Sequence, residues 1–417
     1  MPMREMPKGM LLAGLGRSFS GQDFLLAIIV SSGAIIVLLY GAMGITGNQV
    51  LTAAILFVPT VALFFCGQFA GFRPNPIDGL FVGFLICICA TTLVNGIPAT
   101  RELQLLVLSL LNYPAARFLA VRKPQWSFIA TTSAIVAAGA VATAIALAQQ
   151  WNTSIGKPMV FGFGHAATVF STSLCFLAIN LASTSLDSRR IIRVCAGLFV
   201  PLAIFAASQV RFTFVAGAFA LAVVAAVGQR WRTLLIMAAL GFAILTGLAA
   251  NYRLTALHVT RDIFGQSEIV DDAEAAKDPA WVALAACLGP GSYRNSIAIR
   301  RALLGDAVAQ IPSAGFFGTG LASFRSACLG SESPHNSPLQ AIVEFGWIGG
   351  LAYAALITVA LLRLWPLSFE DAGARFVLSS LIFTVVVSMA YGQLQAEAPL
   401  YLFLGLSAAC VNRYKLS

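Results

Sequence analysis

Apolar runs follow one another along nearly the whole chain, separated by short polar segments and by one long one. Most runs are about 18 to 25 residues long, the length at which an α-helix crosses the ~30 Å hydrocarbon layer of a bilayer. About twelve runs satisfy this criterion. They lie near residues 24–44, 49–66, 77–94, 102–121, 127–149, 162–183, 191–207, 211–228, 232–250, 339–363, 373–391 and 397–412. The pattern predicts an all-α, polytopic membrane protein.

The composition supports the same class. Hydrophobic residues make up 59% of the 417 residues and charged residues 10%, which excludes a soluble globular chain. With the N-terminus in the cytoplasm, 16 Lys/Arg lie on the cytoplasmic side and three in the short outer loops, as the positive-inside rule requires. The net charge of +9 is therefore explained by topology, and we expect membrane lipids and no nucleic acid as partners.

The one long polar segment, residues 251–338, divides the chain into three parts. Residues 1–250 carry the N-terminus and nine predicted spans, and residues 339–417 carry three spans and a cytoplasmic C-terminus. The segment between them is expected outside the cytoplasm. It holds eight carboxylates and seven Lys/Arg, with an amphipathic patch at 296–310, which predicts a folded cap of short helices.

Two of the eight cysteines, Cys287 and Cys328, lie in this outer segment, in an oxidising compartment. A disulfide between them is one hypothesis, and two free thiols the other. The remaining cysteines lie in or near predicted spans. No Cys/His spacing resembles a zinc site, so we expect neither a metal nor a cofactor.

The junction between the outer segment and the tenth predicted span carries the chemical signal. Ser337 is a suitable N-cap, Pro338 suits the first helical position, and Gln340 completes a capping box. His335 and Asn336 then precede a helix N-terminus, where unpaired N–H groups favour an anion and disfavour imidazolium. A neutral imidazole beside an anion suits a general base that activates a hydroxyl. The alternative is an interfacial residue that anchors the span.

A pair of glycines follows at a fixed distance. Gly346 and Gly349 come after His335-Asn336 and nine further residues, and small residues at this spacing predict close approach of a neighbouring helix. The pattern resembles the O-antigen ligase and O-antigen polymerase superfamily, and the ligases most closely. A Gly-rich turn in residues 312–324 is similar to one in the same family.

The resemblance implies a GT-C type, inverting, metal-independent glycosyltransferase of the bacterial inner membrane, with its active site facing the periplasm. The implied donor is a glycan linked to undecaprenyl pyrophosphate. The implied acceptor is a sugar hydroxyl of the lipid A core, deprotonated by His335.

Two arginines align with family positions, Arg211 at the outer end of the eighth span and Arg294 in the outer segment. The resemblance implies that they bind the pyrophosphate, a task that suits a guanidinium because it stays charged and pairs bidentately with phosphate oxygens. With His335 they form the predicted catalytic set. The alternatives are a snorkelling role for Arg211 and a surface ion pair of Arg294 with Asp306.

Five further residues are candidates for substrate binding. Adjacent residues of a helix point in different directions, so we expect one of Arg300 and Arg301 to be a solvated surface residue. Glu344 and Glu397 are expected at membrane depth, where an ionisable group needs a partner or a function, and a buried pair with an arginine is the alternative. The predicted substrate-binding residues are Asn336, Arg300, Arg301, Arg325 and Glu397.

Two other functions remain open. An O-antigen or exopolysaccharide polymerase of the same superfamily would use a second lipid-linked repeat unit as acceptor. A flippase or other transporter of lipid-linked glycans would also be polytopic and cationic inside. Transporters more often show broken spans, internal repeats and charges near the membrane midplane, so the ligase is the preferred prediction.

Overall fold

The computed structural model describes residues 20–44, 48–67, 69, 72–97, 100–119, 123–150, 158–183, 188–208, 210, 212–228, 233–234, 236–249, 296–330 and 333–416. Within them the protein is helical. No β-strand is formed in these ranges, and the only β-type pairings there are two isolated bridges, Val160 with Phe163 and Ser326 with Gly330. The predicted all-α class is confirmed.

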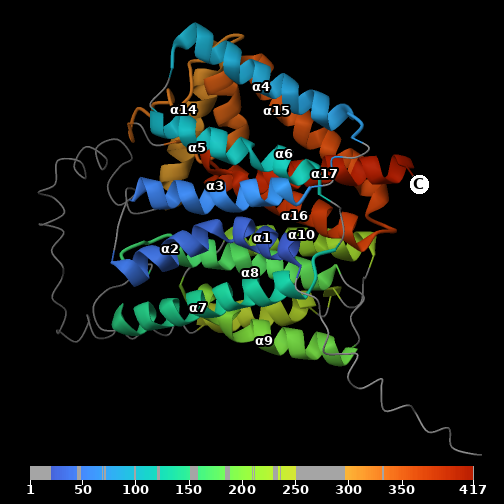
Figure 1. Cartoon of the computed structure of the whole chain (residues 1–417). Helices are drawn as coiled ribbons and strands as arrows, with labels where there is room; N and C mark the ends of the chain where they lie inside the picture. The colour runs from blue at the N-terminus through green and yellow to red at the C-terminus, as the bar shows by residue number, and fades with distance from the viewer. Residues whose placement is uncertain are drawn as a thin grey trace, which may run out of the picture.

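Helix occupies every apolar run that the sequence predicts to span the membrane, with runs 24–44 and 102–121 each divided between two helices. The elements are α1 (Gly21–Val30), α2 (Ser32–Met43), α3 (Gln49–Phe65), α4 (Pro76–Asn95), α5 (Thr100–Leu110), α6 (Asn112–Arg117), α7 (Trp126–Gln150), α8 (Ala166–Ala182), α9 (Ser188–Ala207), α10 (Phe212–Val227), α14 (Ser296–Ala314), α15 (Ser337–Leu367), α16 (Ala372–Tyr391), the 3-10 helix η3 (Leu394–Ala396) and α17 (Ala398–Leu416), with a further helix at Ile236–Ala249. Most of them lie side by side across the view in Figure 1, with α4 and α15 inclined to the rest.

Four of the described helices are long and apolar enough to cross a membrane, namely α4, α7, α15 and α16. A fifth span is possible where α1 and α2 meet at an angle of 75°. The other apolar helices, such as α3, α8 and α10, are shorter. The architecture is therefore that of a helical membrane protein, and the total of about twelve spans stays a prediction.

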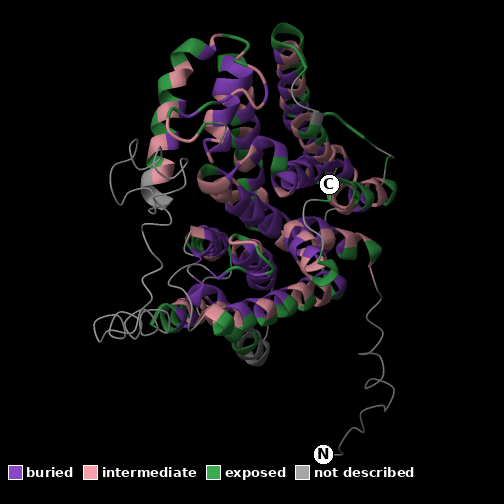
Figure 2. Ribbon diagram, turned by 90° about the vertical axis from the view of Figure 1, so that its left-hand side faces the viewer, coloured by how far each residue is buried: buried purple, intermediate pink, exposed green. Residues whose placement is uncertain are grey.

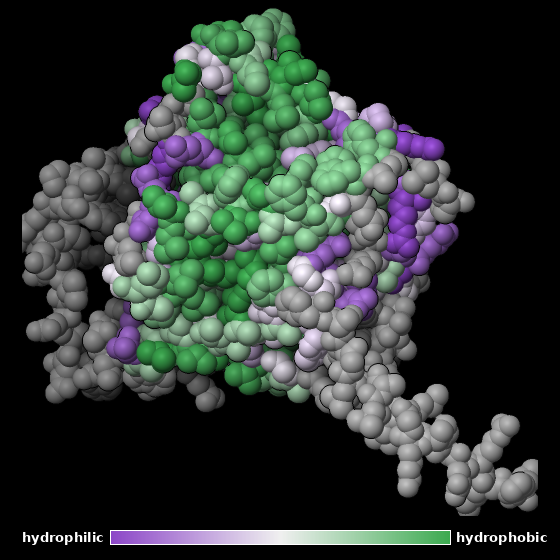
Figure 3. Space-filling model, viewed as in Figure 1, coloured by the Kyte–Doolittle hydropathy of each residue, from purple (hydrophilic) through white to green (hydrophobic). Residues whose placement is uncertain are grey.

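The surface has the character that a lipid environment requires. Figure 3 shows a broad hydrophobic face, with hydrophilic residues gathered towards its left and right edges. Large apolar side chains are exposed in the molecule, among them Val50 and Leu93 with exposed fractions of 80% and 86%. The interior is packed, as Figure 2 shows, and α8 is buried along almost its whole length.

At the far end of the molecule from α14, buried polar contacts join α4 to α6. Asn75 and Asp78 form a capping box at the start of α4. Asp78 also pairs with Arg117 at 2.6 Å and accepts a hydrogen bond of 2.8 Å from the Tyr113 hydroxyl. Every one of these groups has a partner, as buried charge requires, so this cluster is structural.

Candidate functional site

The start of α15 is fixed by Asn336. Its side-chain oxygen accepts a 3.0 Å hydrogen bond from the Leu339 backbone N–H, and its amide nitrogen donates at 3.0 Å to the Met389 carbonyl of α16. Asn336 is therefore the N-cap, and Ser337 is the first helical residue. The predicted Ser337 cap was wrong by one position, because the asparagine before it caps equally well and also reaches α16.

His335 occupies the turn directly before this cap. Its φ of 50° lies in the left-handed region, where a non-glycine residue costs about 1–3 kcal/mol and persists only if the surroundings hold it. Pro334 is buried on one side, and the anchored Asn336 holds the other. The half-buried imidazole is thus presented by a constrained turn.

A buried carboxyl lies against the first turn of α15. Glu397, in the connection that precedes α17, accepts hydrogen bonds from the Ser337 hydroxyl and, at 3.1 Å, from the Tyr353 hydroxyl. No arginine among the described residues pairs with Glu397. The structure places Glu397 beneath the turn, 8% exposed, rather than on an open surface.

Arg300 reaches the same end of α16 from α14. Its guanidinium lies over the Tyr391 ring, 4.3 Å from the centroid, and Phe212 at the start of α10 packs against the same ring with centroids 5.6 Å apart. Tyr391 is two residues from Met389, the residue that Asn336 binds. Residues from α10, α14, α15 and α16 therefore converge. We call His335, Asn336, Arg300, Tyr391 and Phe212 the α16-end cluster.

The other predicted arginines are placed differently. Arg301 is exposed, as expected for one of the two adjacent arginines. Arg325 is also exposed, and its guanidinium donates to the carbonyls of Ala322 and Phe324 in its own loop. Arg211 and Arg294 lie outside the described residues.

The structure describes one of the two cysteines in the outer segment. Cys328 is disulfide-bonded. The six cysteines outside the segment are free. Cys287, the expected partner, lies outside the described residues.

Asp306, the carboxylate named as the alternative partner of Arg294, accepts hydrogen bonds from Ser326 and from the Ala327 backbone. Because Arg294 lies outside the described residues, that pairing stays a prediction.

The first of the two glycines after His335 does not act as predicted. Gly346 has φ 76° and ψ −178° and breaks α15. The carbonyls released before the break accept 3.0 Å hydrogen bonds from the backbone N–H groups of Thr319 and Gly320, and Trp347 N–H donates to Gly315 at 2.9 Å. The Gly-rich turn thus inserts into the break, an arrangement the local sequence did not reveal.

Gly349 fits the expectation of close helix packing better. A Cβ added there would lie 3.6 Å from the Cβ of Cys87 on α4, so this residue faces the neighbouring helix.

Glu344, just before the break, is 1% exposed. It accepts a 3.1 Å hydrogen bond from Gln340, which also donates to Gln395. Gln340 therefore serves a buried network instead of the predicted capping box.

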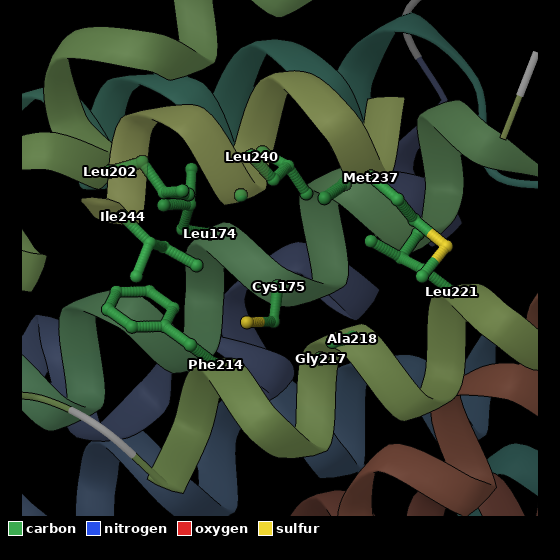
Figure 4. A pocket seen from close by; sticks show the side chains of 12 residues that line it. Leu174, Cys175, Leu202, Phe214, Gly217, Ala218, Leu221, Met237, Leu240 and Ile244 are labelled. Atoms are coloured by element: carbon green, nitrogen blue, oxygen red, sulfur yellow. The ribbon is translucent and has the colours of Figure 1, made fainter. Parts of the chain in front are cut away.

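An apolar cavity begins within one helical turn of the α16-end cluster. Its volume is about 90 Å³, and it is enclosed by side chains of α8, α9, α10 and helix Ile236–Ala249 (Figure 4). Phe214, two residues after Phe212, lines it together with Leu202 and Ile244. Few polar atoms face this space, so it suits a hydrocarbon chain.

Within the described ranges no three His, Cys, Asp or Glu side chains are grouped so that they could hold a metal ion. His165, at the start of α8, packs against Phe163, with ring centroids 5.8 Å apart.

No known protein family, no curated protein and no solved structure matches the chain.

Proposed function

We propose that the protein is an inverting, metal-independent glycosyltransferase of the bacterial inner membrane, of the O-antigen ligase type. The observation that carries the proposal is the α16-end cluster, in which a constrained histidine and a half-buried arginine approach one helix end from different elements. A base for a hydroxyl and a cation for a phosphate are the two groups that such a transfer needs. About twelve spans and a GT-C architecture belong to this proposal.

In the proposed reaction His335 removes the proton from an acceptor hydroxyl. The oxygen then attacks the anomeric carbon of the donor glycan from the face opposite the leaving group, and the bond from that carbon to the pyrophosphate oxygen breaks. The configuration inverts, and undecaprenyl pyrophosphate leaves with both bonding electrons. Arg300, with Arg211 and Arg294, stabilises the charge that develops on the leaving group.

The apolar cavity supports the proposal, because it can receive part of the lipid tail of the donor. It begins at Phe214 on α10, within one turn of Phe212 of the α16-end cluster. A volume of about 90 Å³ accommodates only a short part of such a tail, and the rest would lie among membrane lipids.

Transport is a second function that one observation favours, because broken helices at a binding site are typical of transporters. Both α15 and the α1–α2 pair are interrupted. However, the carbonyls freed at Gly346 are taken up by Thr319 and Gly320 instead of facing a cavity. The break therefore serves to seat the Gly-rich turn, and the transferase is the better-supported proposal.

The test is lipopolysaccharide gel banding in a ligase-deficient host that produces wild type or His335→Ala at matched membrane levels. We expect wild type to restore a ladder on lipid A core and His335→Ala to lower it by about 100-fold or more, because a general base contributes that much. His165→Ala is the matched control, since this histidine packs outside the cluster, and it should behave as wild type.

A second host separates the branches of the superfamily. If wild type lengthens glycan chains only in a polymerase-deficient host, the acceptor is a lipid-linked repeat unit and the ligase assignment is wrong. Equal ladders with His335→Ala and wild type would remove His335 as the base.

A further inference from the structure

Arg300 and Tyr391 form a contact that the proposed reaction does not by itself require. The guanidinium lies 4.3 Å from the ring centroid, well inside the range of a cation–π interaction. Both side chains are half-buried, and partial desolvation strengthens such an attraction. Phe212 packs on the same ring at 66° between planes and so restrains Tyr391.

Among the described residues, the Arg300 guanidinium has no partner besides the Tyr391 ring. No carboxylate pairs with it, and no hydrogen bond joins it to another residue within the described part of the chain. A guanidinium has five N–H donors, and a ring face engages its π surface or at most part of them. Arg325 differs, because its guanidinium donates hydrogen bonds to two carbonyls of its own loop.

The position of the contact adds the second argument. Tyr391 ends α16, two residues after the carbonyl that holds Asn336 and hence the His335 turn. The arginine and the histidine turn are therefore both held by residues at the same end of α16. A change at Tyr391 would release the guanidinium while leaving the histidine turn anchored through Met389.

We propose that Tyr391 is a positioning residue whose ring holds the Arg300 guanidinium at the end of α16, where Asn336 anchors the His335 turn, to bind a phosphate-bearing lipid headgroup. Identifying that headgroup as the donor's pyrophosphate rests on the proposed function. The phosphates of a lipid A acceptor share the chemistry, and the ligands used in the test distinguish the two.

The experiment measures binding of undecaprenyl pyrophosphate, and separately of lipid A, to the full-length protein in nanodiscs. Tyr391→Leu should weaken binding of undecaprenyl pyrophosphate about five- to tenfold, the equivalent of about 1–1.4 kcal/mol. Tyr391→Phe keeps the ring and should stay within about twofold. Tyr391→Met, a longer apolar side chain, repeats the loss if the leucine variant does not fold. Arg363→Gln removes an exposed charge at the other end of α15 and is the control.

A double-mutant cycle decides whether the ring acts through the arginine. In an Arg300→Gln background, Tyr391→Leu should cause no further loss of binding, because the contact is already gone. An equal further loss, or no loss from Tyr391→Leu alone, would overturn the proposal. A stronger effect on lipid A than on undecaprenyl pyrophosphate would assign the headgroup to the acceptor and overturn the donor assignment.

The proposed binding site and the proposed transfer reaction can be disproved independently. If the nanodisc protein binds undecaprenyl pyrophosphate through Tyr391 and Arg300 but restores no glycan ladder, the site stands and the reaction is wrong. If it restores a ladder while Tyr391→Leu raises neither the Kd nor the donor KM, the reaction stands and the positioning role is wrong.

Discussion

A single buried carboxyl supports the turn that carries His335. Glu397 accepts from Ser337 and Tyr353, two residues of α15, while Asn336 reaches across to α16. The histidine's unfavourable φ is thus maintained by side chains from outside its own helix. Any change that weakens these contacts should act on the site through geometry.

Glu397→Ala tests this support through the hydrogen bonds it removes. Replacing the carboxyl side chain by a methyl group leaves the Ser337 and Tyr353 hydroxyls without the acceptor that both use. Each buried hydroxyl without a partner costs about 1–3 kcal/mol. We therefore expect the variant to be less stable than wild type by about 2 kcal/mol or more, measured by thermal unfolding in detergent.

Equal melting temperatures for Glu397→Ala and wild type would show that these hydrogen bonds do not support the turn. Tyr401→Phe is a matched control, because Tyr401 lies on α17, is buried, and its hydroxyl has no hydrogen-bond partner among the described residues. This variant should melt at the temperature of wild type.

At this scale the sequence predicted the start of α15 to within one residue. Asn336 and Ser337 are both good caps, and the choice between them is made by Met389, which is distant in sequence. The pairing of Arg300 with Tyr391 was missed for the same reason. Neither residue carries a local pattern that identifies the other, and only the packing of α14 on α16 joins them.

Among the elements, α15 departs most from an ideal helix. The break at Gly346 exposes two carbonyls, and the Gly-rich turn supplies the N–H groups that pair with them. A Cβ on Gly346 would collide with the Phe316 carbonyl, and a Cβ on Gly318 with the Glu344 carbonyl. Two glycines from separate elements are thus needed at one crossing.

Gly346→Ala should destabilise this crossing. Its backbone conformation, φ 76° with ψ −178°, is almost confined to glycine and costs other residues about 1–3 kcal/mol, to which the collision with Phe316 adds. We expect a lower melting temperature in detergent and a weaker glycan ladder. Gly83→Ala in α4 is the control, since a Cβ there meets nothing within 4 Å and alanine favours a helix by about 0.5–1 kcal/mol.

If the melting temperature of Gly346→Ala equals or exceeds that of Gly83→Ala, the break is not a fixed feature of the protein. The sequence contained the glycines and their spacing but predicted a continuous helical face. The break depends on both α15 and the Gly-rich turn, which are separate in the sequence. A glycine in a helical run can permit close packing, as at Gly349, or a break, as at Gly346, and the local sequence does not distinguish the two.

Over the whole molecule, the sequence predicted the helical class and the position of nearly every apolar helix, because membrane-length runs carry a strong signal. The hydrophobic face with polar edges in Figure 3 is the three-dimensional form of that signal. Orientation depends on loop charge, which the fold alone does not test. It decides whether the α16-end cluster can meet a lipid-linked donor or a cytoplasmic nucleotide sugar.

Two cysteine substitutions near opposite ends of α15 test that orientation. Ala309 is exposed on α14, which packs on the N-terminal part of α15, and Glu370 is exposed just beyond the end of α15. The 31 residues of α15 span roughly 46 Å, more than the ~30 Å hydrocarbon layer. In a background without the exposed Cys66 and Cys89, a membrane-impermeant maleimide should label Ala309→Cys in intact spheroplasts. Glu370→Cys should react only after permeabilisation. The reverse result would place the cluster in the cytoplasm and exclude the proposed donor.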